Sequence, residues 1–417
     1  MVGLRLVQGL ALGGEYGGAA TYVAEHAPRG RRGYATSWIQ TTATLGFFLS
    51  LAVIAICRTQ MDAKVFADWG WRVPFLVSLI LLIFSVYIRL KLNESPIFTQ
   101  MKAEGKGSKS PLTDSFMRYP NNRLVLLALL GATAGQGVVW YTGQFYALFF
   151  LTITLKLDFL SAYTLIGISL LIGTPMFVFF GWLSDRIGRL KIIMAGCLIA
   201  AVSYFWLFGL LTHYVNPDLE AFQAKTKISV TVDPAQCNFH IFVGPWSKFT
   251  ECDRAKDALT KSGLSFSSVK GDPGKPLVVA IGDKKLEGFD AKDGLPKLNA
   301  ALKEAGYSPV ADPKKVNWFM AELILVIFLV YVTMVYGPIA AFLVEMFPTN
   351  IRYTSMSLPY HIGNGWFGGM LPLLATALVA WAGDIYYGLW YPIVIALMTF
   401  VIGMFFIPET KDRDITQ

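Results

Sequence analysis

The sequence predicts an all-α polytopic membrane protein with a small α+β insert outside the membrane. Of its 417 residues, 54% are hydrophobic and only 15% are charged, and the mean hydropathy is +0.49. A soluble domain carries about 25% charged residues. The apolar residues form nine stretches close to the roughly 20 residues that a membrane-spanning helix needs. A polar segment, residues 215–316, separates the sixth stretch from the seventh.

Flanking residues set the ends of the predicted spans. Pro28 and Gly30 follow the first span, Trp69 stands where an interfacial aromatic residue would anchor the third, and Pro408 stops the last. In chain order the predicted spans are residues 3–24, 36–57, 71–90, 123–150, 160–182, 190–213, 318–346, 355–381 and 387–407.

Basic residues in the short loops predict the orientation. Lys and Arg gather after the first, third, fifth, seventh and ninth spans, whereas residues 154–161 hold one lysine and residues 383–388 hold none. Cytoplasmic loops carry the excess of Lys and Arg, so we expect a multi-pass protein of the inner (plasma) membrane with the insert on the periplasmic or extracellular side. The first span would then begin at the outer face without a signal peptide, and we expect that preceding helices are missing.

The insert reads as alternating short strands and helices. Residues 227–232, 238–243 and 275–282 are predicted strands, and 251–263 and 295–307 are predicted helices. Cys237 and Cys252 either form a disulfide, which an oxidising compartment would favour, or stay as two buried thiols.

Composition and motifs exclude several classes of function. The net charge of +8 is spread over short loops between apolar runs, which is not the pattern of a nucleic-acid-binding protein. No Gly-Lys-Ser/Thr phosphate loop joins a strand to a helix, so no nucleotide is expected. The four cysteines show no zinc spacing, and we expect no metal, no cofactor and no enzyme activity.

The stretch GWLSDRIGRLK, residues 181–191, follows the fifth span. Gly181 and Gly188 would permit a tight turn between two antiparallel spans. Asp185 would cap the next helix or pair with a basic residue. The basic side chains would hold the turn in the headgroup layer, and they are Arg186, Arg189 and Lys191.

This loop resembles the signature of the major facilitator superfamily in its second-half copy. RLVQG (5–9) resembles the fourth-helix pattern, and residues 5–33 resemble the fourth helix and loop of the metabolite:proton symporter family. That family carries citrate, α-ketoglutarate, shikimate, and proline or betaine. WGWRVPFL (69–76) with RLKLNESPIF (89–98), and residues 344–369, resemble its sixth, tenth and eleventh helices.

The resemblance implies an incomplete major facilitator fold with about nine of twelve helices, lacking the first three. The expected domains are 1–90 (helices 4–6), 91–122 (cytoplasmic linker), 123–214 (helices 7–9), 215–316 (the insert), 317–407 (helices 10–12) and 408–417 (cytoplasmic tail).

The first span carries the best candidates for proton coupling or substrate binding. At 100° per residue, Arg5, Gln8 and Glu15 share one arc, while Gly9 and other glycines form separate strips for close helix packing. A carboxylate in a membrane is costly and usually faces a cavity or a partner. Glu15 could therefore exchange protons, and the alternative is a structural Arg–Glu pair to a missing or neighbouring helix.

Further candidates line later spans. Gln136, Trp140 and Gln144 recur one helical turn apart, with Tyr141 nearby, and they suit either packing or a polar solute. Resemblance places them in the seventh helix, which lines the central cavity. His361 and Asn364 lie one turn apart in the eighth span and could share a proton or bond across helices.

A cytoplasmic gate is expected around the motif loop. Glu345 and Arg352 would join the Asp185 and Arg186 loop, and Pro338 should kink the seventh span. Glu25 is expected to pair with Arg31, Arg32 or the second-half loop. Glu322 should be solvated at the outer face.

We therefore expect a secondary active transporter. It would move a small polar metabolite, a carboxylate or a zwitterion, with protons across the membrane, and would be a monomer when complete. The alternative is a truncated, non-transporting fragment, or a membrane platform whose outer insert binds a ligand or partner.

Overall fold

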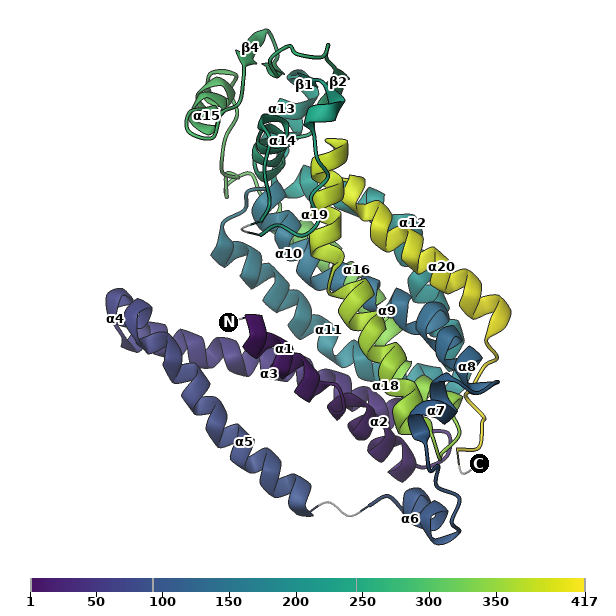
Figure 1. The fold of residues 1–417 in the computed structure, drawn as a ribbon. Coiled ribbons are helices and arrows are strands. Elements are labelled where there is room, and N and C mark those ends of the chain that lie inside the picture. Colours follow the sequence, from purple (N-terminus) through teal and green to yellow (C-terminus); the bar gives the residue numbers. More distant parts are fainter. Residues whose placement is uncertain (1, 92–93, 245, 416–417) are drawn as a thin grey trace.

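The computed structural model describes residues 2–91, 94–244 and 246–415, without the side chains of residues 2, 5, 10–12, 47, 51, 55, 63 and 96. Within this part of the chain, eight helical segments are long and apolar enough to cross a membrane. Most pack into one elongated bundle with the insert at one end (Figure 1). We call this the insert end. The opposite end, which carries the loops at 29–32, 186–189 and 410–413, is the basic end.

The helices before the insert are α1 (Val2–Leu12), α2 (Glu15–His26), α3 (Arg32–Gln60), α4 (Ala63–Asp68), α5 (Val73–Lys91), α6 (Pro96–Ala103), α7 (Pro111–Phe116), α8 (Asn121–Ala128), α9 (Ala134–Tyr141), α10 (Ala147–Phe149), α11 (Phe159–Ile187) and α12 (Arg189–Val215). The helices after the insert are α16 (Trp318–Tyr336), α17 (Ile339–Met346), α18 (Arg352–Ile362), α19 (Leu371–Ala382) and α20 (Trp390–Phe406). Short 3-10 turns are η1 (Gly70–Arg72), η5 (Pro234–Gln236) and η7 (Tyr387–Leu389).

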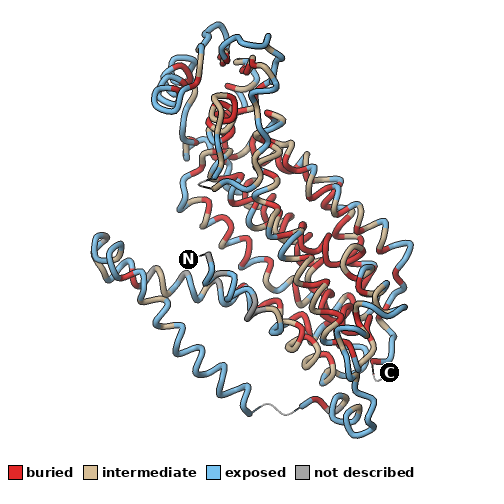
Figure 2. The backbone as a smooth tube through the Cα atoms, viewed as in Figure 1, coloured by how far each residue is buried: buried red, intermediate tan, exposed pale blue. Residues whose placement is uncertain are grey.

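Wide π-helical turns interrupt two of the spans. They are η2 (Leu129–Thr133), η3 (Thr142–Tyr146), η4 (Phe150–Thr154) and η6 (Gly363–Gly368). The first three lie in the span Asn121–Thr154, which is one of the most buried spans. Such turns often mark functional sites in helices. Figure 2 shows that buried residues concentrate in the bundle formed by residues 121–215 and 318–406.

The expected single first span is wrong, because α1 and α2 are separate helices divided at Gly13 and Gly14. Glycine is a poor helix former, and the hydroxyl of Tyr353 donates to the carbonyl of Gly14. An outside donor thus satisfies a carbonyl at the break. By contrast, the helix is interrupted where a kink was expected at Pro338, since α16 ends at Tyr336 and α17 begins at Ile339.

Helices α4 and α5 stand apart from the bundle (Figure 1). Helix α5 is strongly apolar, yet none of its described residues is buried. The tight packing between the start of the chain and the rest is instead made by α2 and α3, which lie against α18 and α11.

The insert is a four-stranded sheet with the order β2-β1-β3-β4. Strand β1 (Ile228–Val232) is parallel to β2 (Ser267–Lys270) and antiparallel to β3 (Val278–Ile281), which pairs with β4 (Lys284–Glu287). Helices α13 (Pro217–Lys225), α14 (Glu251–Lys261) and α15 (Gly294–Glu304) complete it.

Two insert predictions need correction. Residues 238–243 do not form a strand, because the backbone of Asn238 bonds to the Asp253 carboxylate rather than to a neighbouring strand. Strands β2 and β4 and helix α13 were not foreseen. In the structure a disulfide joins Cys237 and Cys252, whose Cα atoms are 5.2 Å apart.

Backbone hydrogen bonds join the insert to the bundle. The amide of Phe266 donates to the carbonyl of Gly383 at 2.6 Å, and the amide of Ala311 donates to that of Lys156 at 3.0 Å. Gly383 has φ +78°, and a Cβ there would lie 2.2 Å from the Phe266 carbonyl. The helix end therefore requires glycine at this position.

Candidate functional site

The Asp185 carboxylate joins the motif loop to the start of α3. It accepts from the backbone amides of Gly33 at 2.9 Å and Tyr34 at 2.8 Å, and it pairs with Arg189 at 2.6 Å. Of the two expected roles, the pairing with a basic residue is confirmed by Arg189, whereas the helix that Asp185 caps is α3 and not the next helix. The start of α12 is capped by Glu409, which accepts from the amides of Arg189 and Leu190.

Arg189 and Glu345 form the buried centre of this network. The guanidinium donates to both Glu345 carboxylate oxygens, at 3.1 and 3.2 Å, and both side chains are fully buried. Glu345 also accepts from Thr410 at 3.0 Å and lies 3.7 Å from Arg32. Buried charges of this kind persist only when they are paired and hydrogen-bonded.

A second buried pair joins α2 to α18. Arg352 donates to Glu25 at 2.7 Å, and Ser95 also donates to Glu25. The remaining guanidinium nitrogens of Arg352 donate to backbone carbonyls, including that of Ile415 at 2.7 Å. The partner of Glu25 is therefore Arg352, and not Arg31, Arg32 or the second-half loop as expected.

The two motif glycines have different tasks. Gly188 joins α11 to α12 with φ +118°, and a Cβ there would lie 2.3 Å from the Glu409 carboxylate. Gly181 is not a turn residue as expected. It lies where α11 crosses α3, and a Cβ there would lie 2.4 Å from the Ser37 Cβ and 2.6 Å from the Gly33 carbonyl.

Arg186 lies beside the network, and no ion pair of its guanidinium is seen among the described residues. Its guanidinium stacks 3.9 Å from the centre of the Trp182 ring, and its backbone carbonyl accepts from Lys411 at 3.0 Å. We call the residues joined by these ion pairs and helix caps the basic-end network. It comprises Glu25, Arg32, Asp185, Arg189, Glu345, Arg352 and Glu409.

A cavity of about 270 Å³ lies between α3 and the later helices. Gln40 and Thr44 line it from α3, Trp140 and Gln144 from α9 and η3, and Tyr336 from the end of α16. Apolar residues of α11 complete the wall. On α3, Gln40 is seven residues from Gly33, so the cavity lies about 10 Å along the helix from the Asp185 cap.

A chain of hydroxyl and amide groups runs past this cavity. The Gln40 amide donates to the Tyr16 hydroxyl at 2.7 Å, and the Tyr16 ring stacks on Tyr360 with centroids 3.6 Å apart. The hydroxyls of Tyr360 and Tyr336 are 2.6 Å apart. Two hydrogen bonds and one ring stack thus link α2 and α3 to α18 and α16, and each hydroxyl or amide in them can donate or accept.

The residues predicted to share one face of the fourth span lie in two different environments. Trp140 and Gln144 face the cavity, but Gln136 is fully buried and exchanges two amide hydrogen bonds of 3.0 Å with Asn364. Tyr141 does not line the cavity and stacks against Phe145, with centroids 5.3 Å apart. The Nε2 atom of His361 is buried without a hydrogen-bond partner among the described residues.

The predicted arc of the first span is not formed as expected. Glu15 begins α2, is half exposed, and pairs with Arg89 at the end of α5. Gln8 lies exposed on α1. The side chain of Arg5 is outside the described residues, so its expected role stays a prediction. Gly17 and Gly14 do pack closely, against Ser357 and Tyr353, whereas no atom of the described residues lies within 4 Å of a Cβ placed at Gly9.

Several residues of the site were missed from sequence. Gln40, Thr44 and Tyr16 contribute to the cavity and the hydroxyl chain, and Glu409 caps α12. A polar residue inside an apolar span, as at Gln40, is the one signal that could have found them. Glu322 was expected to be solvated, but both carboxylate oxygens are buried without a partner among the described residues.

Fold and site together define a class of protein, the polytopic helical membrane protein with a cavity between its helices, lined by apolar side chains and a few neutral polar groups. Comparison with known proteins identifies the family. A sequence profile described as Major Facilitator Superfamily matches residues 1–216, and a profile described as Sugar (and other) transporter matches residues 305–417. The chain belongs to the major facilitator superfamily, which confirms the resemblance seen in its motifs.

Curated relatives and a solved structure agree with this placement. The shikimate transporter of Escherichia coli K12 is 31% identical over 50% of this chain and 47% of its own length. The proline/betaine transporter of the same strain is 34% identical over 46% and 40%. A putative metabolite transport protein of Haemophilus influenzae is 26% identical over 98% and 70%. The proton:xylose symporter XylE has a TM-score of 0.55 at 16% identity, covering 95% of this chain and 68% of its own.

The chain thus matches about half of the length of the shikimate and proline/betaine transporters. The solved symporter, at low identity, shares the fold alone. Among the described residues, no group of three or more His, Cys, Asp or Glu side chains could hold a metal ion.

Proposed function

We propose that the protein is a secondary active transporter that moves a small polar metabolite with protons by alternating access. The carrying observation is the cavity between α3 and helices α9, α11 and α16. About 10 Å further along α3, the basic-end network joins two of these helices, α3 and α11, to α12 and α17. A binding space between two helical parts, closed at one end by ion pairs, is what a rocking mechanism requires.

The cavity lining favours a substrate without net charge, and among the carboxylates and zwitterions considered above we propose a zwitterion. The cavity residues carry neutral amides, hydroxyl groups, aromatic rings and aliphatic side chains, and no charged residue is among them. The faces of Trp140 and Tyr336 would attract an alkylammonium group. The amide nitrogens of Gln40 and Gln144 can donate to a carboxylate.

Two carboxylates are candidates for the coupled proton. Glu15 pairs with Arg89 at the α2–α5 contact, and protonation would release that arginine. We propose that this pair carries the coupling. Glu15→Gln should then abolish accumulation driven by a pH gradient while exchange of substrate without a gradient continues. Unchanged accumulation would exclude Glu15 and direct attention to the buried carboxylate of Glu322.

The test is uptake by the full chain reconstituted in liposomes with an inward proton gradient. Shikimate, proline and betaine are the compounds that the named relatives carry, so these are the three probes. We expect accumulation of proline or betaine above that of shikimate, and loss of accumulation when a protonophore collapses the gradient. Absence of gradient-driven uptake of all three would contradict the proposal.

A matched pair of variants ties uptake to the cavity. Gln144→Ala removes a lining amide and should lower uptake at least about tenfold, which corresponds to roughly 1.4 kcal/mol in binding. Gln236→Ala changes an exposed glutamine of the insert and should leave uptake unchanged. Equal effects of the two variants would place the binding site elsewhere.

A further inference from the structure

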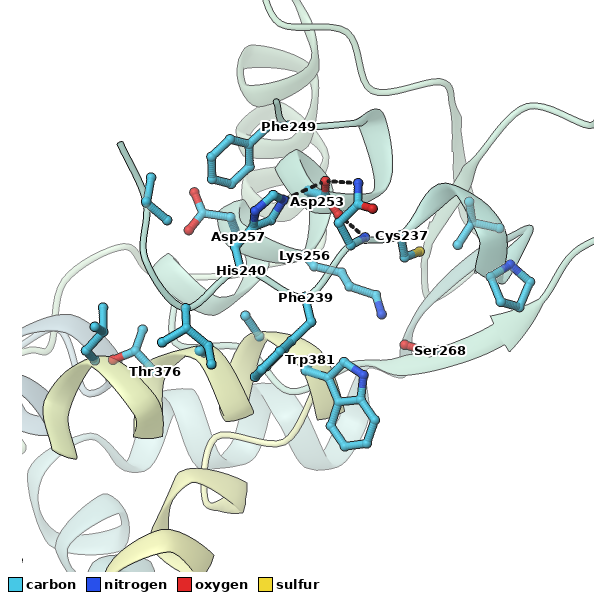
Figure 3. A pocket seen from close by; sticks show the side chains of 18 of the residues that line it. Cys237, Phe239, His240, Phe249, Asp253, Lys256, Asp257, Ser268, Thr376 and Trp381 are labelled. Atoms are coloured by element: carbon cyan, nitrogen blue, oxygen red, sulfur yellow. Dashed lines mark hydrogen bonds and ion pairs between the residues drawn. The ribbon is translucent and has the colours of Figure 1, made fainter. Parts of the chain in front are cut away.

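A second cavity, of about 470 Å³, lies outside the bundle between the insert and the end of α19. Figure 3 shows its lining side chains, which come from the loop after Cys237, from α14, from β2 and from α19. The insert therefore does not simply rest on the bundle. Together the two parts enclose a space that neither part would form alone.

The loop that walls this cavity is held in place by Asp253. Its carboxylate accepts from the amides of Asn238 at 2.7 Å and Thr250 at 2.9 Å, and lies 3.0 Å from His240 Nε2. The His240 ring in turn stacks on Phe249, with centroids 4.5 Å apart. The loop shape is thus fixed by buried contacts before any ligand enters.

Among the described residues that line the cavity, the charged groups without an ion-pair partner are positive. Lys256 extends from α14 into the space (Figure 3), and no ion pair or hydrogen bond of its amine is seen among the described residues. Lys270 of β2 also lines the cavity, and no ion pair or hydrogen bond of its amine is seen among the described residues either. The two carboxylates nearby are engaged, Asp253 by the loop and Asp257 by Lys261 at 2.7 Å. Burial lowers the pKa of the Lys256 amine below its usual value, and the Asp253 charge offsets only part of this effect.

The opposite wall is apolar and aromatic. The rings of Phe239 and Trp381 meet edge to face with centroids 6.4 Å apart. Leu373, Ala377 and Ala380 of α19 continue the apolar surface beside them. An amine on one side and aromatic rings on the other are complementary to a molecule with an anionic group and an apolar body.

We propose that this cavity is a binding site for an amphipathic anion, with the anionic group at Lys256 and the apolar body between Phe239 and Trp381. Two sources share this chemistry: a soluble aromatic or aliphatic carboxylate, and the headgroup region of an anionic lipid beside the end of α19. The proposal is independent of the transport proposal, because none of these residues lines the cavity between α3 and α11.

The test uses the full chain in nanodiscs of phosphatidylcholine and 1-naphthoate as the probe, with binding measured by calorimetry. The neutral 1-naphthamide has the same ring system without the charge and should bind at least about tenfold more weakly. Lys256→Gln should weaken 1-naphthoate about tenfold and leave 1-naphthamide unchanged. Lys303→Gln, an exposed site on α15, is the control and should change neither.

A second arm separates the two sources. Nanodiscs with one third phosphatidylglycerol are compared with pure phosphatidylcholine. If 1-naphthoate binds more weakly in the phosphatidylglycerol nanodiscs, and this difference disappears in Lys256→Gln, the ligand is the lipid. If 1-naphthoate binds equally in the two kinds of nanodisc, the ligand is a soluble carboxylate. Equal affinity for naphthoate and naphthamide, or a Lys256→Gln variant that binds naphthoate normally, overturns the proposal. Unchanged thermal unfolding of the variant shows that its insert is folded.

Discussion

The fully buried Arg189–Glu345 pair shows why the motif loop needs an arginine at this position. The guanidinium contacts both carboxylate oxygens and also reaches Ser184 and Asp185. A lysine has one nitrogen and could not make this fork of contacts. The pair therefore fixes the positions of α12 and α17 relative to the cap of α3.

Removing one partner of this pair should cost more stability than removing both. Arg189→Met leaves the Glu345 charge buried and should destabilise the protein by about 3–5 kcal/mol, whereas Arg189→Met with Glu345→Leu should restore most of the loss. Thermal and denaturant unfolding in detergent measures both. Lys275→Met, at an exposed pair with Asp272, is the control and should change nothing measurable. Equal losses in the single and double variants would contradict the argument.

Asp253 gives the insert a dependence on pH. Burial alone would raise the pKa of this carboxyl, but hydrogen bonds from Thr250, Asn238 and His240 outweigh it and lower the pKa to about 2. A carboxyl whose pKa is lower in the folded state stabilises the fold at pH values above its unfolded pKa of about 3.9. This contribution to the free energy of unfolding is lost as the pH falls from about 4 to about 2.

We therefore expect the loop at 238–249 to open in acid. Amide hydrogen exchange of this segment, measured by mass spectrometry, should rise relative to the rest of the insert between about pH 4 and pH 2. Asp253→Asn should show raised exchange already at pH 6 and no further relative rise in acid. A wild-type loop whose relative protection stays constant down to pH 2 would contradict this role for Asp253.

At the scale of elements, the crossing of α3 and α11 depends on two glycines that face each other. Gly181→Ala would place a Cβ 2.4 Å from Ser37 and 2.6 Å from the Gly33 carbonyl, so the helices must separate. Overpacking of this kind costs about 1–3 kcal/mol. Gly167→Ala on the same helix meets nothing within 4 Å and is the control.

We expect Gly181→Ala to unfold at lower temperature than Gly167→Ala and to lose uptake in the liposome assay. Crosslinking between cysteines introduced at Tyr34 and Asp185 should also slow, because the α3 start is displaced from the motif loop. Equal melting temperatures for the two alanine variants would show that the crossing tolerates a methyl group.

The sequence predicted elements better than it predicted contacts. Long apolar runs located eight of the nine expected spans among the described residues, because a bilayer demands about 20 apolar residues, and the motif identified Asp185, Arg189 and the turn at Gly188. The strand expected at 238–243 failed because a single carboxylate, Asp253, binds that backbone from another element. The alternation of polar and apolar residues in a sequence cannot show that a side chain from another element binds the backbone of that segment.

Contacts across the chain lay beyond sequence reasoning. The pairing of Glu25 with Arg352 joins residues 327 positions apart, and the stacking of Tyr16 on Tyr360 depends on how α2 meets α18. The periodicity of one helix indicates which residues share a face, but not which other helix that face meets. Gln40 was missed for this reason, although its place in an apolar span is unusual.

At the scale of the whole molecule, the two ends differ in charge and in covalent chemistry. The basic end carries Arg29, Arg32 and Lys411, and the insert end carries the Cys237–Cys252 disulfide. Basic loops stay in the cytoplasm, and disulfides persist in oxidising compartments. Both arguments assign the same orientation, and we propose that the insert faces the periplasm or cell exterior.

Labelling in intact cells tests this orientation. A cysteine at Lys303, exposed on α15 of the insert, should react with a membrane-impermeant maleimide without lysis, and a cysteine at Lys411 should react only after permeabilisation. The native thiols Cys57 and Cys197 are buried and provide the background, which the unsubstituted chain measures. Labelling of Lys411→Cys in intact cells, with Lys303→Cys protected until lysis, would reverse the orientation. It would also place the basic-end network on the outer side, so that its ion pairs would close the cavity against the exterior instead of the cytoplasm.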